Sequence, residues 1–117
     1  MTKILVADDN ADIRKVIKAA LSRKEYRIVE AEDGAAAIKK LQTEKFDLLI
    51  TDFDMPAANG IEVMEKALFL YPKMPVLLVS ANLPPAIAEK AKRLATCILE
   101  KPFEISKLTA AVSLLLK

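Results

Sequence analysis

The residues of this chain that are best suited to chemistry are acids, a serine and a lysine, placed at or just after the ends of short apolar runs. They are Asp8, Asp9, Asp52, Asp54, Ser80 and Lys101. Neighbouring carboxylates repel one another by roughly 4 kcal/mol per pair when they lie about 4 Å apart at an effective dielectric of about 20. A divalent cation with oxygen ligands relieves this repulsion, and Mg²⁺ is the usual choice where phosphate is the other ligand. If the fold gathers these residues, they predict a site for a divalent cation such as Mg²⁺.

Five short runs are the candidate strands that could carry these residues. Lys3–Asp8, Leu48–Thr51 and Val76–Ser80 are mostly apolar, as in strands of a parallel sheet that is covered on both faces. Tyr26–Ala31 alternates in part, which suits a strand near the sheet edge, and Thr96–Leu99 is the fifth candidate.

Amphipathic stretches separate the runs and predict five helices. The apolar positions at helical spacing are Ile13, Val16, Ile17, Ala20 and Leu21 in the first, Ile61, Met64, Ala67 and Leu68 in the third, and Ile105, Leu108, Val112 and Leu115 in the fifth. The second helix is expected over Gly34–Leu41 with Asp33 as its N-cap. The fourth is expected over Ala86–Leu94, opened by Pro84 and Pro85.

Strands that alternate with helices predict an α/β fold of the flavodoxin-like type. Its doubly wound sheet would have five parallel strands, joined by right-handed crossovers, with helices on both faces. Sites in such sheets form at the carboxyl ends of the strands. Because the candidate residues occupy those ends, the topology predicts that they meet in one crevice.

Length and composition set the remaining limits. A chain of 117 residues suits one domain, 1–117, and its net charge of +2 is too small to predict binding to nucleic acid or membrane. Lys90, Lys92 and Arg93 are expected to form a solvated helix face, and Cys97 is expected to be a buried structural thiol.

The absence of histidine excludes a Ser-His-Asp triad and an imidazole metal site. No run approaches the roughly 18 apolar residues of a membrane span, so a cytoplasmic location is expected.

The motifs, taken in order, resemble the response-regulator receiver family of two-component signalling. The chain has an acid pair after the first strand, Asp52 followed by Met55, Pro56 and Gly60 after the third, Ser80-Ala81 after the fourth, and Lys101-Pro102-Phe103 after the fifth. The resemblance covers the whole chain and rests on the combination, since no single motif carries it.

The resemblance implies a role for each candidate residue. Asp52 would accept the phosphoryl group. Asp8 and Asp9 would bind Mg²⁺ or Mn²⁺, with Asp9 as the direct ligand, and the backbone carbonyl of Asp54 would complete the metal shell. The Ser80 hydroxyl would bond a phosphoryl oxygen, and Lys101, before a cis peptide bond to Pro102, would pair first with the acids and then with the phosphate. The chemistry agrees, because phosphoryl transfer needs neutralised oxygens more than it needs a base.

Three positions depart from the family pattern. Ile98 stands where the family usually has an aromatic switch residue, and Leu94-Ala95-Thr96 replaces the usual Gly-Ala before the last strand. Asp54 adds a negative side chain at the mouth of the site. Isoleucine is β-branched, with a stiff χ1 and no polar tip. The response to phosphorylation is therefore expected in the Ser80–Pro85 loop and the following helix, with little change at Ile98.

The resemblance also implies partners. A sensor histidine kinase or a phosphotransfer protein would supply the phosphoryl group. A downstream protein would bind the face formed by the fourth helix, the fifth strand and the last helix. Direct binding to nucleic acid and insertion into a membrane are not expected.

No output segment follows Lys117, so the chain is either a stand-alone receiver or a part of a longer regulator. The protein would be a switch that assists only its own phosphorylation and dephosphorylation.

Two alternatives differ from this reading in function. A degenerate receiver would act as an interaction module without phosphorylation, which the missing aromatic at position 98 favours and the complete set of acids opposes. A haloacid-dehalogenase-type phosphatase would use the Asp-x-Asp pair in Leu48–Asp54. In that class the pair follows the first strand, whereas here it follows the third, and Asp8 and Asp9 would have no role.

Overall fold

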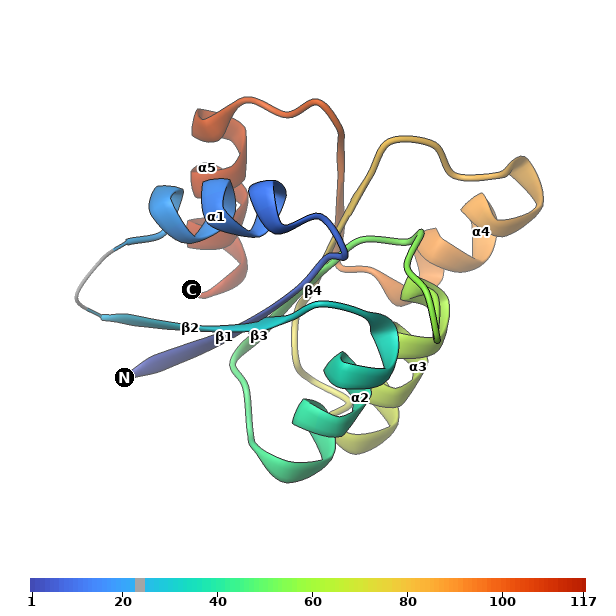
Figure 1. Cartoon of the computed structure of the whole chain (residues 1–117), viewed down its shortest axis with the longest axis horizontal. Coiled ribbons are helices and arrows are strands. Elements are labelled where there is room, and N and C mark those ends of the chain that lie inside the picture. The colour runs from blue at the N-terminus through green and yellow to red at the C-terminus, as the bar shows by residue number, and fades with distance from the viewer. Residues whose placement is uncertain (23–24) are drawn as a thin grey trace.

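The computed structural model describes residues 1–22 and 25–117, and within them strands and helices alternate along the chain (Figure 1). The elements are β1 Thr2–Ala7, α1 Ala11–Ala20, β2 Tyr26–Ala31, α2 Gly34–Thr43, β3 Leu48–Thr51, α3 Gly60–Leu70, β4 Val76–Ser80, α4 Pro85–Leu94, β5 Cys97–Glu100 and α5 Ile105–Leu115. The sheet order is β2-β1-β3-β4-β5, and every neighbouring pair is parallel. The predicted flavodoxin-like, doubly wound fold is confirmed.

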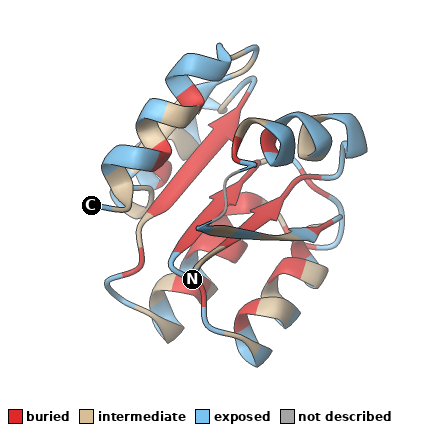
Figure 2. Ribbon diagram, turned by 90° about the vertical axis from the view of Figure 1, so that its left-hand side faces the viewer, coloured by how far each residue is buried: buried red, intermediate tan, exposed pale blue. Residues whose placement is uncertain are grey.

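The sheet separates two hydrophobic cores. Successive side chains of a strand point to opposite faces, so Ile4 and Val6 of β1 pack on one side and Leu5 on the other. The first core lies under α1 and α5, and the second lies under α2, α3 and α4. Figure 2 shows the central strands buried, whereas most residues of the edge strand β2 are intermediate or exposed. The predicted edge position of Tyr26–Ala31 is confirmed.

The boundaries of several elements differ from the predicted ones by one or two residues. Strand β1 begins at Thr2 and ends at Ala7, and helix α2 continues to Thr43. Strand β5 runs over Cys97–Glu100, because Glu100 pairs with Ser80 in the register of β4 and β5. Helix α4 begins at Pro85, one residue earlier than predicted.

Three burial predictions were wrong. Val16 and Ile105 are 41% and 47% exposed, although both belong to apolar helical stripes. Val16 precedes the fully buried Ile17 by about 100° of helix rotation, so it lies on the flank of the stripe. Cys97 is only partly buried, because β5 is an edge strand. The predicted solvated face of Lys90, Lys92 and Arg93 is confirmed.

Side-chain caps fix the starts of the first three helices, in the loops that follow β1, β2 and β3. The Asn10 side chain accepts from the amides of Asp12 and Ile13, and Asp33 caps α2 as predicted. At α3, Asn59 and Glu62 form a reciprocal capping box. These caps hold short loops in place at the carboxyl edge of the sheet. In the part of the chain that the structure describes, no helix has the length and apolar content that crossing a membrane requires.

Candidate functional site

All six candidate residues line one pocket at the carboxyl edge of the sheet. The pocket has a volume of about 280 Å³ and is lined by Asp8, Asp9, Asn10, Asp52, Asp54, Ser80, Ala81, Asn82 and Lys101. A larger hollow of about 740 Å³, between Lys45 and Pro75, contains none of the six. The strand topology therefore gathers the predicted residues in one place.

Three of the acids form a cluster with the dimensions of a cation site. Oxygen atoms of Asp8, Asp9 and Asp52 all lie within 4.8 Å of one another. Octahedral Mg²⁺ has oxygen ligands at about 2.1 Å, which places those ligands about 3 to 4.2 Å apart. Asp8 and Asp52 are 2% and 8% exposed, whereas Asp9 is exposed to solvent. The donor set therefore fits a hard divalent cation that enters from the side of Asp9.

Lys101 compensates part of the negative charge of this cluster. Its Nζ donates to Oδ2 of Asp8 at 2.8 Å and lies 3.4 Å from Oδ2 of Asp52. Burial alone would lower the pKa of the Lys101 ammonium, but the hydrogen bond and charge of Asp8, together with Asp52, raise it above its ordinary value. Three carboxylates against one ammonium leave two negative charges, which is the charge that one divalent cation neutralises.

The backbone at Lys101 continues the pairing of β5 with β4. The Lys101 amide donates to the carbonyl of Ser80 at 3.0 Å, which extends the pairing of β4 and β5 by one residue. The Lys101–Pro102 peptide bond is cis, as the resemblance implied.

The backbone holds Asp52 at several points. Its amide donates to the carbonyl of Ala7 at 2.9 Å, and its Oδ1 accepts from the Phe53 amide at 2.8 Å. Helix α3 begins so close to it that a Cβ on Gly60 would lie 2.3 Å from the Asp52 carbonyl oxygen. Glycine is therefore required at position 60 for this approach. The Asp52 carboxylate is oriented before any ligand arrives.

Burial raises the pKa of the Asp52 carboxyl above its ordinary value. The charge of Lys101 opposes this rise, and the charge of Asp8 adds to it. A raised pKa means that the folded protein holds this proton more tightly than the unfolded chain does. The contribution of Asp52 to stability is then complete below the unfolded pKa of about 4 and is lost as the pH rises through the folded pKa.

Asp52→Asn is therefore expected to stabilise the metal-free protein increasingly as the pH rises from about 3.5 to 7. The gain should be about 1.4 kcal/mol for each unit by which folding raises the pKa of Asp52. The measurement is urea unfolding of both proteins in a chelating buffer across this pH range. A difference in unfolding free energy that stays flat or falls with pH would contradict the environment described for Asp52.

Ser80 connects the acid pocket to a second cavity. The residue is 5% exposed and also lines a cavity of about 590 Å³ between the β4–α4 loop, α4 and β5. Ile98 and Glu100 of β5 and Lys92 of α4 form part of the wall of this cavity. Ile98, which replaces the usual aromatic residue of the family, therefore lies beside the loop that carries Ser80.

Several residues that shape the site were missed by the sequence analysis. A Cβ on Gly34 would lie 1.7 Å from the carbonyl oxygen of Ala58, so α2 packs directly on the loop after β3. Ala57 in that loop has a positive φ of 71°. Arg14 donates to the backbone carbonyl of Asp8. Gly34 directly follows the predicted N-cap Asp33, which was a usable signal for the close contact with Ala58. Nothing in the local sequence pattern indicates the positive φ of Ala57 or the hydrogen bond from Arg14.

Comparison with known proteins agrees with this arrangement. The family described as response regulator receiver domain matches residues 4–113. The response regulator receiver protein CpdR of Brucella abortus is 32% identical over 118 residues, covering 99% of this chain and 98% of CpdR. Other curated relatives are longer, and the chain spans about half of the transcriptional regulatory protein TctD of Salmonella typhimurium, at 32% identity and 52% coverage.

Solved structures agree as well. A CheY-like receiver domain protein from Methanospirillum hungatei JF-1 superposes with a TM-score of 0.93 at 25% identity, covering 99% of this chain and 94% of that chain. The response regulator TrrA from Thermotoga maritima, in complex with Mg(2+)-BeF, superposes with a TM-score of 0.87 at 30% identity, covering 98% of this chain and 99% of that one. A family match over nearly the whole sequence, with relatives and structures that agree, shows that the chain belongs to the response regulator receiver family of two-component signalling.

Proposed function

We propose that this chain accepts a phosphoryl group on Asp52 and passes the event on through a change of surface, with residues 1–117 acting as one receiver domain. The observation that carries the proposal is the meeting of Asp8, Asp9 and Asp52 within 4.8 Å, with the Lys101 ammonium in hydrogen-bond contact and Ser80 in the same pocket. A sensor histidine kinase or a phosphotransfer protein would be the donor.

The residues of the pocket have separate tasks in the transfer. A carboxylate oxygen of Asp52 forms the new bond to phosphorus while the bond from phosphorus to the donor's leaving group breaks, and that group takes up a proton. The Phe53 amide keeps the carboxylate in place. Lys101 and the Ser80 hydroxyl then offer donors to the phosphoryl oxygens, where they stabilise the charge. The product is a hydrolysable acyl phosphate, which suits a reversible signal.

Asp8 and Asp9, with Asp52, would hold the divalent cation, Mg²⁺ or Mn²⁺, and the carbonyl of Asp54 would complete its shell. When bound, this cation would supply positive charge to the phosphoryl oxygens. Both oxygens of Asp8 already accept hydrogen bonds, from the Asn10 amide and from Lys101. Asp9 is exposed, so it is the acid that we assign as the direct ligand.

The output would pass through the β4–α4 loop. Ser80 gains a charge-assisted hydrogen bond when a phosphoryl group is present, and this bond favours a loop conformation that moves toward Asp52. The cavity between this loop, α4 and β5 leaves room for such a movement. We propose that the face formed by α4, β5 and α5 then binds the downstream protein.

Beryllofluoride with Mg²⁺, the ligand in the TrrA structure, tests this proposal as a mimic of the phosphoryl group. In NMR spectra, the largest amide shifts are expected in the Ser80–Pro85 loop and the first turns of α4, with little rotamer change at Ile98. The same titration of Asp52→Asn, and of wild type with Mg²⁺ alone, should lack these shifts. If Ser80–Leu94 stays still while α1 or α3 responds, this account of the output is wrong.

A degenerate receiver that works only as an interaction module would show no beryllofluoride response at all. The intact acid set and the Lys101 pairing favour the phosphorylated switch over that alternative. The phosphatase alternative lacks support from the topology, because its Asp-x-Asp pair would follow β3, in the middle of the sheet order, and would leave Asp8 and Asp9 without a task.

A further inference from the structure

The carbonyl of Asp8 lies where the sheet can no longer supply a hydrogen-bond donor. Strand β2 ends at Ala31, the last partner in its register with β1, and the Asp8 amide makes the final contact to the Ala31 carbonyl at 3.2 Å. The Asp8 carbonyl instead accepts from Nη1 of Arg14 at 2.7 Å. A side chain of α1 thus replaces the donor that a longer strand would have provided.

This bond acts on Asp9 through the peptide plane that Asp8 and Asp9 share. A peptide unit is planar, so fixing the Asp8 carbonyl also fixes the Asp9 amide and the direction in which the chain enters Asp9. Asp8 has three further contacts of its own, from its amide and from both carboxylate oxygens. The exposed Asp9 depends far more on the backbone that carries it.

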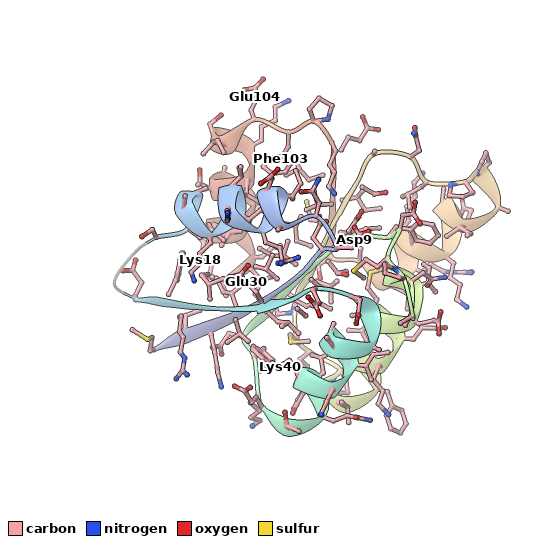
Figure 3. The ribbon with its side chains drawn as sticks, in the orientation of Figure 1. Asp9, Lys18, Glu30, Lys40, Phe103 and Glu104 are labelled. Carbon is pink, nitrogen blue, oxygen red and sulfur yellow. The ribbon has the colours of Figure 1, made fainter. Side chains whose placement is uncertain are left out.

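Arg14 is itself held by β2. Its Nε donates to Oε1 of Glu30 at 3.1 Å, and its side chain is only 15% exposed. Lys18, one turn further along α1, lies 3.6 Å from Oε2 of Glu30. Figure 3 shows Lys18 and Glu30 facing each other between α1 and β2, and Asp9 beyond them at the end of β1. The planar guanidinium can serve a carbonyl and a carboxylate together, which an ammonium on a flexible stem cannot do in the same geometry.

We propose that Arg14, braced by Glu30, is a positioning residue that sets the Asp8–Asp9 peptide and thereby the affinity of the pocket for a divalent cation. This role rests on the proposed function of the pocket. For removal of the Arg14 side chain, this role predicts a change in cation affinity opposite to the one that electrostatics alone predicts. Removing a positive charge near a cation site should strengthen cation binding, whereas removing the positioning contact weakens it.

The test is Mg²⁺ titration by calorimetry of wild type, Arg14→Ala, Arg14→Lys and Lys18→Ala. Arg14→Ala is expected to lose affinity about tenfold, the lower end for residues that orient a metal ligand. Arg14→Lys keeps the charge and should still bind more weakly than wild type. Lys18→Ala is the matched control, because it removes the same charge and a Glu30 contact from the same helix, and its affinity should be unchanged or slightly higher.

Glu30 extends the test. Glu30→Ala should lower the affinity in the same direction as Arg14→Ala, and the double variant should lose no more than Arg14→Ala alone. Glu30→Gln keeps an oxygen acceptor for Nε and should stay close to wild type. In metal-free NMR spectra, the Asp9 and Asn10 amides should shift in Arg14→Ala while the amides of the two cores do not.

The outcomes separate the two proposals. If wild type binds Mg²⁺ and Arg14→Ala binds it equally well or more tightly, or if Lys18→Ala loses as much, the positioning role is overturned and the proposed function stands. If wild type binds no Mg²⁺, the proposed function fails and the positioning role fails with it. Should Arg14→Ala not fold, Arg14→Lys and Glu30→Ala decide the question by the same criteria.

Discussion

Asp52→Asn is expected to reduce phosphoryl incorporation from acetyl phosphate and Mg²⁺ to background, a loss of more than about 10³-fold, because an amide cannot replace a nucleophilic carboxylate. The variant should fold normally, since the asparagine oxygen can still accept the hydrogen bond that the Phe53 amide gives to Asp52. Intact-protein mass spectrometry measures the incorporation. The wild-type product should be stable in acid and labile in base, as an acyl phosphate is.

Asp12→Asn is the matched control for this experiment. It makes the same substitution, aspartate to asparagine, at an exposed position in the first turn of α1. Asp12 does not line the acid pocket. This variant should incorporate phosphoryl groups as wild type does. Incorporation that persists in Asp52→Asn would place the acceptor elsewhere and remove the central element of the proposed function.

Asp9→Ala should weaken Mg²⁺ binding by at least about 100-fold, and Asp8→Ala by about tenfold, because the loss of a direct ligand costs more than the loss of an outer or shared one. The structure supplies the reason for the difference. Asp8 is buried, and both of its carboxylate oxygens accept hydrogen bonds, whereas Asp9 faces solvent at the mouth of the pocket.

Calorimetric titration with Mg²⁺ compares the two variants directly. Thermal unfolding without metal serves as the control for folding, and it matters most for Asp8→Ala, which leaves the Lys101 ammonium without its shortest contact. Equal affinities of wild type and both variants would mean that the cation binds away from this cluster. A larger loss in Asp8→Ala than in Asp9→Ala would reverse the assignment of the direct ligand.

The fold and most of the pocket could be predicted because both depend on local patterns joined to one topological rule. Strands β1, β3 and β4 are mostly apolar runs, and the rule that parallel strands end at a common edge brings Asp8, Asp52 and Ser80 together. Strand β5 contributes Lys101 in the same way. No knowledge of side-chain packing was needed for this step.

Predictions that required distances between elements failed or were not made. Helical periodicity identified the buried side of α1, but the width of the stripe depends on how closely α1 and α5 pack, so Val16 was misplaced. The reach of Arg14 to both Asp8 and Glu30 depends on where α1 lies over β1 and β2. The close approach at Gly34 joins the start of α2 to the loop after β3, which is distant from it in the sequence.

The contact between Lys101 and Asp8 joins residues that are 93 positions apart. A chain leaving the ribosome therefore presents all three clustered acids long before the lysine that pairs with them has been made. Contacts between distant parts of a chain form late in folding, since the loop between them must close first. β5 is an edge strand and follows the other four described strands in the chain, so its docking onto β4 completes the pocket. If Asp52 accepts a phosphoryl group as proposed, a chain that stops before Lys101 is expected not to take it up, although it already contains all three clustered acids.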